Sequence, residues 1–170
     1  MQQALCHTPI AEILADQLML KVSDVYHGPV DWVAGSDHAA ATLSYSVAVR
    51  NRARHDFTEK GDGKSQKWSR FKIGPGEAVL QVEELITTLL TMEAVRKGIR
   101  AAHEWNITFT PVVGVLVNRS SAQEFEGSPI VSLATYDIKT WEPSDCPLCA
   151  AGSKRVRPKA NWVELTGRAT

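Results

Sequence analysis

The sequence predicts an α/β fold: a doubly wound parallel sheet with helices on both faces and an inserted β-hairpin. Short apolar runs alternate with stretches of helical periodicity along most of the chain. One turn signal, Gly61-Asp62-Gly63, lies between two polar segments and interrupts that alternation, which indicates the hairpin. A length of 170 residues is enough for one domain with a substantial core.

The first half of the chain is expected to form a helix, a strand, a second helix and the hairpin. Thr8 and Pro9 are typical of a helix start. The apolar residues expected on one face of that helix are Ile10, Ile13, Leu14, Leu18 and Val22. The later elements are predicted at residues 30–35 (strand), 38–52 (helix, with Leu43, Tyr45 and Val47 buried), 55–59 (strand) and 67–73 (returning strand).

The second half repeats the strand-helix-strand order. Its predicted elements are strands at 78–82, 111–117 and 130–134 and a helix from about 88 to 104. No internal repeat or linker divides the chain. We therefore predict a single domain over residues 1–170, with an α/β core at 8–143 and a C-terminal segment at 144–170.

Composition excludes several classes of protein. Lysine plus arginine and aspartate plus glutamate each number 19, so the formal net charge is zero, and the basic excess typical of nucleic-acid or anionic-membrane binders is missing. No apolar run reaches the ~18 residues that a membrane span needs. Three cysteines are an odd number and disfavour a disulfide scaffold. We expect a cytoplasmic protein that binds neither nucleic acid nor membrane.

Residues 79–91, VLQVEELITTLLT, carry the clearest functional signal. A buried strand leads to the carboxylates of Glu83 and Glu84, and a helix start follows with Thr87, Thr88 and Thr91. Ligands of open α/β sheets bind at the carboxyl ends of the strands, and phosphates bind at helix N-termini. This order predicts a site for a phosphorylated sugar. The simpler alternative is that the two carboxylates only complement a helix dipole.

This segment resembles the 13-residue signature of the type I phosphoribosyltransferases. In that family an acidic pair for the ribose hydroxyls precedes a Thr-Thr-Gly-Gly-Ser/Thr loop for the 5-phosphate of phosphoribosyl pyrophosphate. The chain has both acids and the threonines, with Leu89 and Leu90 in place of the two glycines. The resemblance implies the type I phosphoribosyltransferase fold.

Three more stretches resemble the same family in the same order. Residues 30–48 resemble the strand and loop that hold the pyrophosphate, with Ala39-Ala40 where the family has a glycine pair. Thr58-Glu59-Lys60 resembles the strand with a lysine before the mobile catalytic hairpin. Residues 141–152 (WEPSDCPLCAAG) resemble the C-terminal Cys-Pro-Leu-Cys segment of one branch of orotate phosphoribosyltransferases.

The resemblance implies a transferase of pyrimidine nucleotide synthesis. Such an enzyme joins orotate to the anomeric carbon of phosphoribosyl pyrophosphate and releases pyrophosphate, with Mg²⁺ held chiefly through the substrate. It also implies a homodimer. The implied catalytic residues are Glu83, Glu84 and Lys60, and both glutamates are candidate ligands of Mg²⁺. The implied substrate-binding residues are Gly35, Ser36, Asp37, His38, Ala39 and Ala40 for pyrophosphate, and Thr87, Thr88, Leu89, Leu90 and Thr91 for the 5-phosphate.

The departures from the family pattern favour a second hypothesis. If Leu89 and Leu90 took the left-handed backbone angles of a glycine loop, each would cost about 1 to 2 kcal/mol. Asp37 beside a pyrophosphate would be repulsive. The alternative is therefore a catalytically decayed homologue that binds a nucleotide or a partner protein through the same crevice.

Other features have a simple structural interpretation. Cys146 and Cys149 could be half of a zinc site, but a structural turn is favoured because Cys6 is the one other cysteine. A redox role is favoured less, because the pair does not follow an early strand at a helix start. Trp68 is expected to pack, with contact to a partner as the alternative. The basic residues of the hairpin could be only a solvated face, an alternative as strong as a functional role: Lys60, Lys64, Lys67, Arg70 and Lys72.

Overall fold

The computed structural model describes residues 2–139, 141–157 and 160–167. It divides into two compact units, Met1–Asp137 and Ile138–Thr170. The second unit contains two short helices, α5 (Pro147–Ala150) and α6 (Trp162–Thr166). In the described part of the chain, no helix is long and apolar enough to cross a membrane.

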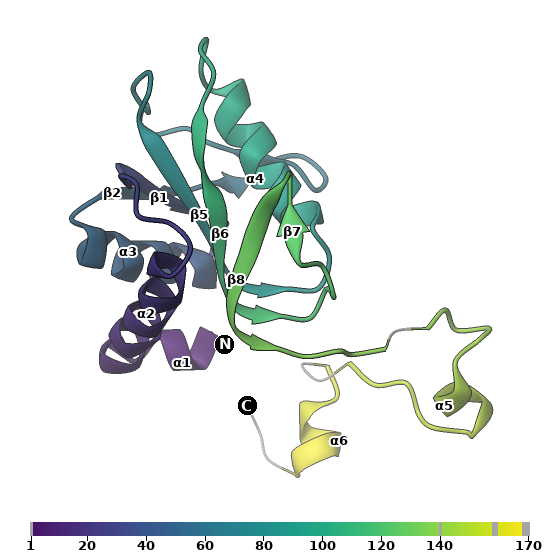
Figure 1. Ribbon diagram of the computed structural model, residues 1–170. Helices are drawn as coiled ribbons and strands as arrows, with labels where there is room; N and C mark the ends of the chain where they lie inside the picture. Colours follow the sequence, from purple (N-terminus) through teal and green to yellow (C-terminus); the bar gives the residue numbers. More distant parts are fainter. Residues whose placement is uncertain (1, 140, 158–159, 168–170) are drawn as a thin grey trace. The chain divides into compact units, whose positions relative to one another are not determined.

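The first unit is built around a six-stranded sheet in the order β2-β1-β5-β6-β8-β7 (Figure 1). Neighbouring strands are parallel from β2 to β8, and the short β7 pairs antiparallel with β8. This arrangement confirms the predicted parallel sheet. The strands are β1 (Trp32–Gly35), β2 (Arg54–Phe57), β5 (Ala78–Ile86), β6 (Thr108–Asn118), β7 (Glu124–Phe125) and β8 (Ser128–Thr135).

Helices cover both faces of the sheet (Figure 1). Helices α2 (Thr8–Ser23) and α3 (Ala39–Asn51) pack on one face, and α4 (Leu90–Ala101) packs on the other. Successive strand residues alternate between the two cores, as a pleated strand requires: Val33 packs with α2 and α3, whereas Trp32 and Ala34 pack on the α4 side. A four-residue helix, α1 (Gln2–Leu5), precedes α2.

The start of α2 is where the sequence predicts it, but its buried face differs. Its fully buried residues are Ala11, Ala15, Leu18 and Val22. Ile10 and Ile13 are 42% and 60% exposed. Two alanines at the contact let the helix backbone approach its neighbours closely, and this turns the larger isoleucines towards solvent. Tyr45 of α3 is also exposed, contrary to the prediction.

The hairpin is shorter than predicted. Its strands are β3 (Glu59–Lys60) and β4 (Gln66–Lys67), and the predicted returning strand at 67–73 is otherwise irregular. Trp68 is buried in the core on the α4 side, which confirms packing. A Cβ added to Gly98 of α4 would lie 2.3 Å from the carbonyl oxygen of Gln66, so glycine allows the hairpin to rest directly on α4.

Strand β5 extends four residues beyond the predicted end at 82. Glu83 and Glu84 therefore belong to the strand, and Glu83 lies opposite Val115 of β6. Helix α4 begins at Leu90 and ends at Ala101, inside the predicted range of 88 to 104. The acidic pair is thus fixed by the sheet ladder.

Candidate functional site

The loop after β1 enters α3 through a tight turn. A Cβ on Gly35 would lie 2.9 Å from the carbonyl oxygen of Ala40 and 3.0 Å from that of Val82, so only glycine fits between α3 and β5. His38 has φ 64° and ψ −117°, a strained conformation for a residue with a side chain. Ala39 and Ala40 are buried in the first turn of α3. The predicted loop therefore ends at His38.

Glu83 ties the end of β5 to this loop. Its carboxylate accepts hydrogen bonds from the Ser36 backbone N–H (3.2 Å) and from the Ser36 hydroxyl (2.7 Å). The side chain is almost fully buried. Burial raises the pKa of Glu83 to about 8, and the nearby charges of Glu84 and Asp37 act in the same direction. At neutral pH this carboxyl is therefore mostly protonated.

Glu84 lies on the opposite side of β5 and is half-buried. Partial burial raises the pKa of its carboxyl, and the charge of Asp37 adds to this effect while His38 opposes it. Both charges come from the loop after β1. The predicted acidic pair and the predicted pyrophosphate loop therefore lie at one place in the fold.

The hairpin brings a lysine to the same place. Lys60 Nζ lies 3.6 Å from Oδ2 of Asp37, and Nδ1 of His38 lies 2.7 Å from the same oxygen. Lys60 is exposed, whereas the Asp37 side chain is mostly covered. The repulsion expected between Asp37 and a pyrophosphate is thus offset by a neighbouring cation.

The turn between β5 and α4 contains the predicted 5-phosphate residues. Thr87, Thr88 and Thr91 are exposed. Leu89 occupies the N-cap of α4 and provides no side-chain cap, so the first-turn N–H groups point outward without a capping side chain. This geometry is suited to an anion.

Two hollows lie between the hairpin and α4. The larger has a volume of about 450 Å³ and the smaller about 200 Å³. Lys60 and Thr91 line the smaller one, together with Lys64 and Leu90. Glu83 and Glu84 line neither hollow. The structure therefore brings Lys60 together with Thr91 on one side and with Asp37 on the other.

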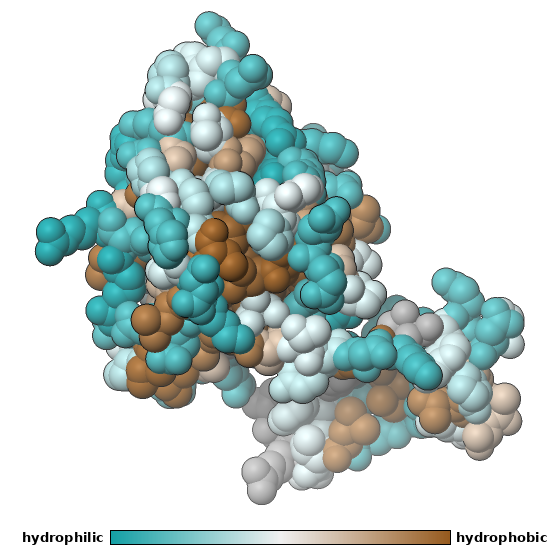
Figure 2. All heavy atoms as spheres, viewed as in Figure 1, coloured by the Kyte–Doolittle hydropathy of each residue, from teal (hydrophilic) through white to brown (hydrophobic). Residues whose placement is uncertain are grey.

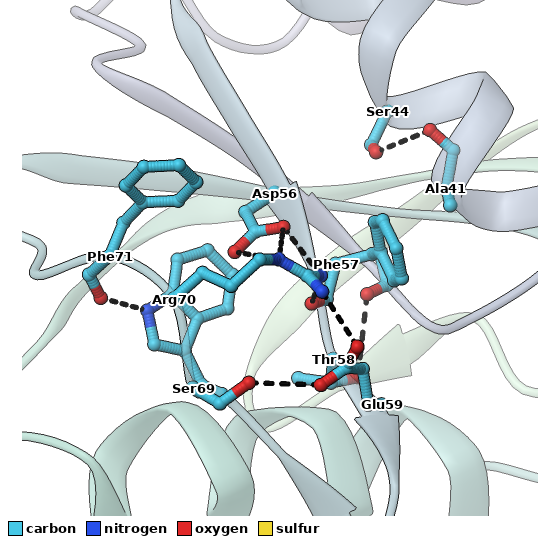
Figure 3. A network of polar contacts seen from close by, with 11 residues as sticks. Ala41, Ser44, Asp56, Phe57, Thr58, Glu59, Ser69, Arg70 and Phe71 are labelled. Atoms are coloured by element: carbon cyan, nitrogen blue, oxygen red, sulfur yellow. Dashed lines mark hydrogen bonds and ion pairs between the residues drawn. The ribbon is translucent and has the colours of Figure 1, made fainter.

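Arg70, one of the basic residues of the hairpin, holds the base of the hairpin (Figure 3). Arg70 Nη2 donates to Asp56 Oδ1 at 2.8 Å and Nη1 donates to Glu59 Oε1 at 2.6 Å. The guanidinium also lies 4.2 Å from the centre of the Phe57 ring. Since Asp56 is buried in β2 and Glu59 precedes Lys60, Arg70 connects the sheet to the strand that carries the lysine.

Comparison with known proteins gives the family. The chain is 36% identical over 149 residues to the orotate phosphoribosyltransferase of Caldicellulosiruptor bescii, which is 88% of this chain and 75% of that protein. It is 33% identical over 135 residues to the orotate phosphoribosyltransferase of Thermotoga maritima, covering 79% and 70% of the two chains. The chain belongs to the orotate phosphoribosyltransferase family. The resemblance seen in its motifs is thus confirmed. No family model matches the chain.

Solved structures agree with the fold of this family. Orotate phosphoribosyltransferase from Aeropyrum pernix matches with a TM-score of 0.59 at 20% identity, over 79% of this chain and 76% of that one. Adenine phosphoribosyltransferase from Rhodothermus marinus matches with a TM-score of 0.56 at 15% identity, over 78% and 83%. The predicted type I phosphoribosyltransferase fold is confirmed.

In this member of the orotate phosphoribosyltransferase family, Leu89 and Leu90 have unstrained backbone angles. Leu89 has φ −83° and ψ −2°, in the right-handed region, and Leu90 is the first residue of α4. The described residues with side chains and positive φ are His38, Arg52, Ser121 and Glu126. Leu89 and Leu90 therefore do not take the left-handed angles of a glycine loop, because α4 begins where the family pattern has that loop.

Proposed function

We propose that the chain transfers the phosphoribosyl group of phosphoribosyl pyrophosphate to orotate, with release of pyrophosphate. The observation that carries this proposal is the convergence of three segments at one site. The Glu83–Ser36 hydrogen bond joins β5 to the loop after β1, and the Lys60–Asp37 ion pair joins that loop to the hairpin. Membership of the orotate phosphoribosyltransferase family supports the same reaction.

Each segment has a role that its chemistry supports. Glu84 holds the ribose hydroxyls. Glu83 holds the loop after β1 in place through its hydrogen bonds to Ser36. Thr87, Thr88 and Thr91 and the first turn of α4 bind the 5-phosphate, together with the backbone of Leu89 and Leu90. The loop from Gly35 to Ala40 receives the pyrophosphate. Lys60 neutralises the charge of the leaving group as the hairpin closes.

Little proton transfer is needed, because the transition state has oxocarbenium character and a stable leaving group. The residues act by position and by charge. Glu84 is the group best placed for a developing positive charge on the ribose, since it is half-buried and its charge is only partly screened. Lys60 acts on the opposite, negative part of the reacting substrate.

Mg²⁺ is proposed to bind through the substrate. Among the described residues, no group of three or more His, Cys, Asp or Glu side chains is arranged to hold a metal. Burial raises the pKa values of Glu83 and Glu84, and a bound cation would favour their ionised forms. Bound Mg²⁺ would neutralise pyrophosphate charge and keep most of its ligands from water and substrate.

A catalytically decayed homologue is the second candidate. Two observations favour it: Leu90 is 56% exposed at the start of α4, where bulk reduces room for a phosphate, and Asp37 already neutralises Lys60. Such a protein would bind a nucleotide or a partner protein through the same crevice.

Turnover separates the two candidates. Phosphoribosyl pyrophosphate is titrated into the chain by calorimetry with Mg²⁺, and orotate consumption is followed by its ultraviolet absorbance. Loss of orotate that depends on both substrates supports the enzyme. Binding without turnover supports the decayed homologue, and neither binding nor turnover contradicts both.

The ribose assignment has its own test. We expect Glu84→Ala to weaken binding of phosphoribosyl pyrophosphate by about tenfold or more, because a charge-assisted contact to a hydroxyl is lost. Glu104→Ala removes an exposed carboxylate after α4 and is the matched control. Equal affinities of the two variants would contradict the role of Glu84.

A homodimer in the cytoplasm is also proposed. Hydrophobic side chains gather over β6 and β8 in the middle of the face that Figure 2 draws. Val117, Val131 and Leu133 of these strands are only partly buried. An apolar stripe of this kind supports contact with a second copy. Sedimentation should give twice the monomer mass, and a monomer at micromolar concentration would contradict this.

A further inference from the structure

The Cys146-Pro147-Leu148-Cys149 motif is not used by the proposed reaction and lies in the second unit. Cys149 is exposed and Cys146 is partly exposed, and both are free thiols. The motif forms a single helical turn, α5, which begins at Pro147. Cys146 thus stands directly before a helix start, whereas the strand that precedes the pair is β8, late in the chain, as expected.

The turn brings the two cysteines together. The Cys149 backbone N–H donates to Cys146 Sγ at 3.4 Å. The Ala150 N–H donates to the Cys146 carbonyl at 3.0 Å and closes the same turn. A single helical turn therefore holds the two cysteines next to each other, three residues apart.

The geometry of the α5 turn alone does not explain why both positions 146 and 149 are cysteine. Serine, aspartate and asparagine cap helices better than cysteine does, and the second thiol adds nothing to the cap. Packing does not explain them either, because α5 has no buried residue. No third metal ligand joins them among the described residues. What remains is the chemistry of a neighbouring thiol pair.

We propose that Cys146 and Cys149 form a reversible dithiol–disulfide site that reacts with low-molecular-weight disulfides such as oxidised glutathione. The Cys146 thiolate attacks one sulfur of the disulfide, which forms a mixed disulfide and releases one glutathione thiolate. Cys149 then gives up its proton and attacks the Cys146 sulfur, which closes the internal disulfide and releases the second glutathione. The protein loses two hydrogens and one glutathione disulfide is reduced to two thiols.

The two thiols are unequal in a way that supports these roles. Hydrogen bonds from the Cys149 backbone and thiol lower the pKa of Cys146, whereas contact with Cys146 raises the pKa of Cys149. A thiolate is the attacking species, so Cys146 is the nucleophile and Cys149 the resolving thiol.

Cys6 provides an internal control. It is exposed, lies in the first unit, and its thiol donates to the Gln3 carbonyl at 3.1 Å. The full chain is equilibrated with glutathione buffers of graded oxidation, trapped with acid and digested for mass spectrometry. The peptide with Cys146 and Cys149 should lose two hydrogens, whereas Cys6 should carry a glutathione adduct. Adducts on Cys146 and Cys149 like that on Cys6 would overturn the proposal.

Two variants test the roles. Cys149→Ser should trap glutathione on Cys146, and its Cys146 should be alkylated by iodoacetamide at neutral pH at least about threefold faster than Cys149 in Cys146→Ser. Equal alkylation rates would overturn the assignment of the nucleophile. A zinc content of about half an equivalent per chain, protecting both thiols, would overturn the redox role in favour of a metal shared by two copies.

Discussion

Lys60 Nζ and Asp37 Oδ2 lie 3.6 Å apart at the edge of the site, so the hairpin lysine is already paired with a carboxylate. A negatively charged substrate must compete with Asp37 for this lysine. The pair therefore holds Lys60 near its place of action and also weakens its attraction for pyrophosphate. These opposing effects can be separated by removing the charge of Asp37 alone.

We expect Asp37→Asn to lower the KM for phosphoribosyl pyrophosphate by about threefold to tenfold, because one repulsive charge is removed and Lys60 is released. Steady-state kinetics at fixed orotate measures this. Asp62→Asn is the control, since it removes the same charge from the exposed hairpin turn, where Asp62 lies 3.9 Å from Lys67. An unchanged or higher KM in Asp37→Asn would mean that Asp37 serves chiefly to position Lys60.

The pKa of Glu83 predicts how stability depends on pH. It is raised from 4.5 to about 8, so the folded protein holds one more proton than the unfolded chain between these values. The resulting stabilisation is full below about pH 4.5 and is lost as pH rises towards about 8. Between about pH 6 and pH 8 the loss is on the order of 2 kcal/mol.

Glu83→Gln should remove much of this pH dependence, because glutamine imitates the protonated carboxyl and can still accept from Ser36. Urea unfolding at several pH values compares the two proteins. The slope that remains reports other groups, including Glu84, whose pKa is also raised. An identical slope in the two proteins would show that Glu83 is ionised when folded.

Because the backbone of Leu89 is right-handed, replacing it with glycine is expected to alter stability more than substrate binding. Leu89→Gly with Leu90→Gly relieves no strain, so we expect affinity for phosphoribosyl pyrophosphate to change by less than about threefold. The free energy of unfolding should fall by about 2 to 4 kcal/mol, since Leu89 packs against a core and glycine weakens a helix. Leu20→Gly, at an exposed position of α2, is the control for helix propensity. Tenfold tighter binding would instead mean that leucine bulk fills the phosphate position.

The sequence predicted most of the sheet because buried parallel strands leave continuous apolar runs, as at residues 111–117. It could not predict β7 (Glu124–Phe125), because two residues have no periodicity. It predicted the site residues from their order along the chain. It could not predict that Leu89 would be right-handed, because that depends on where α4 begins. The sequence also could not predict the pairing of Lys60 with Asp37, because this contact depends on how the hairpin folds back onto the loop after β1.

The pairing of Arg70 with Asp56 was not predicted for a similar reason, although a signal existed: Asp56 is a charged residue in a predicted strand, and arginine binds carboxylates with two parallel hydrogen bonds. We expect Arg70→Ala to lower the free energy of unfolding by about 2 to 4 kcal/mol, because it leaves the buried Asp56 without its partner. Arg50→Ala breaks an exposed pair with Asp16 and should cost at most about 1 kcal/mol. Arg70→Lys should not restore stability, since an ammonium cannot reach both Asp56 and Glu59 in the same geometry.

Because Glu59 precedes Lys60, the KM for phosphoribosyl pyrophosphate should rise in both Arg70 variants and stay unchanged in Arg50→Ala. Equal effects of the Arg70 and Arg50 variants on unfolding and KM would reduce the Arg70 network to an ordinary surface ion pair.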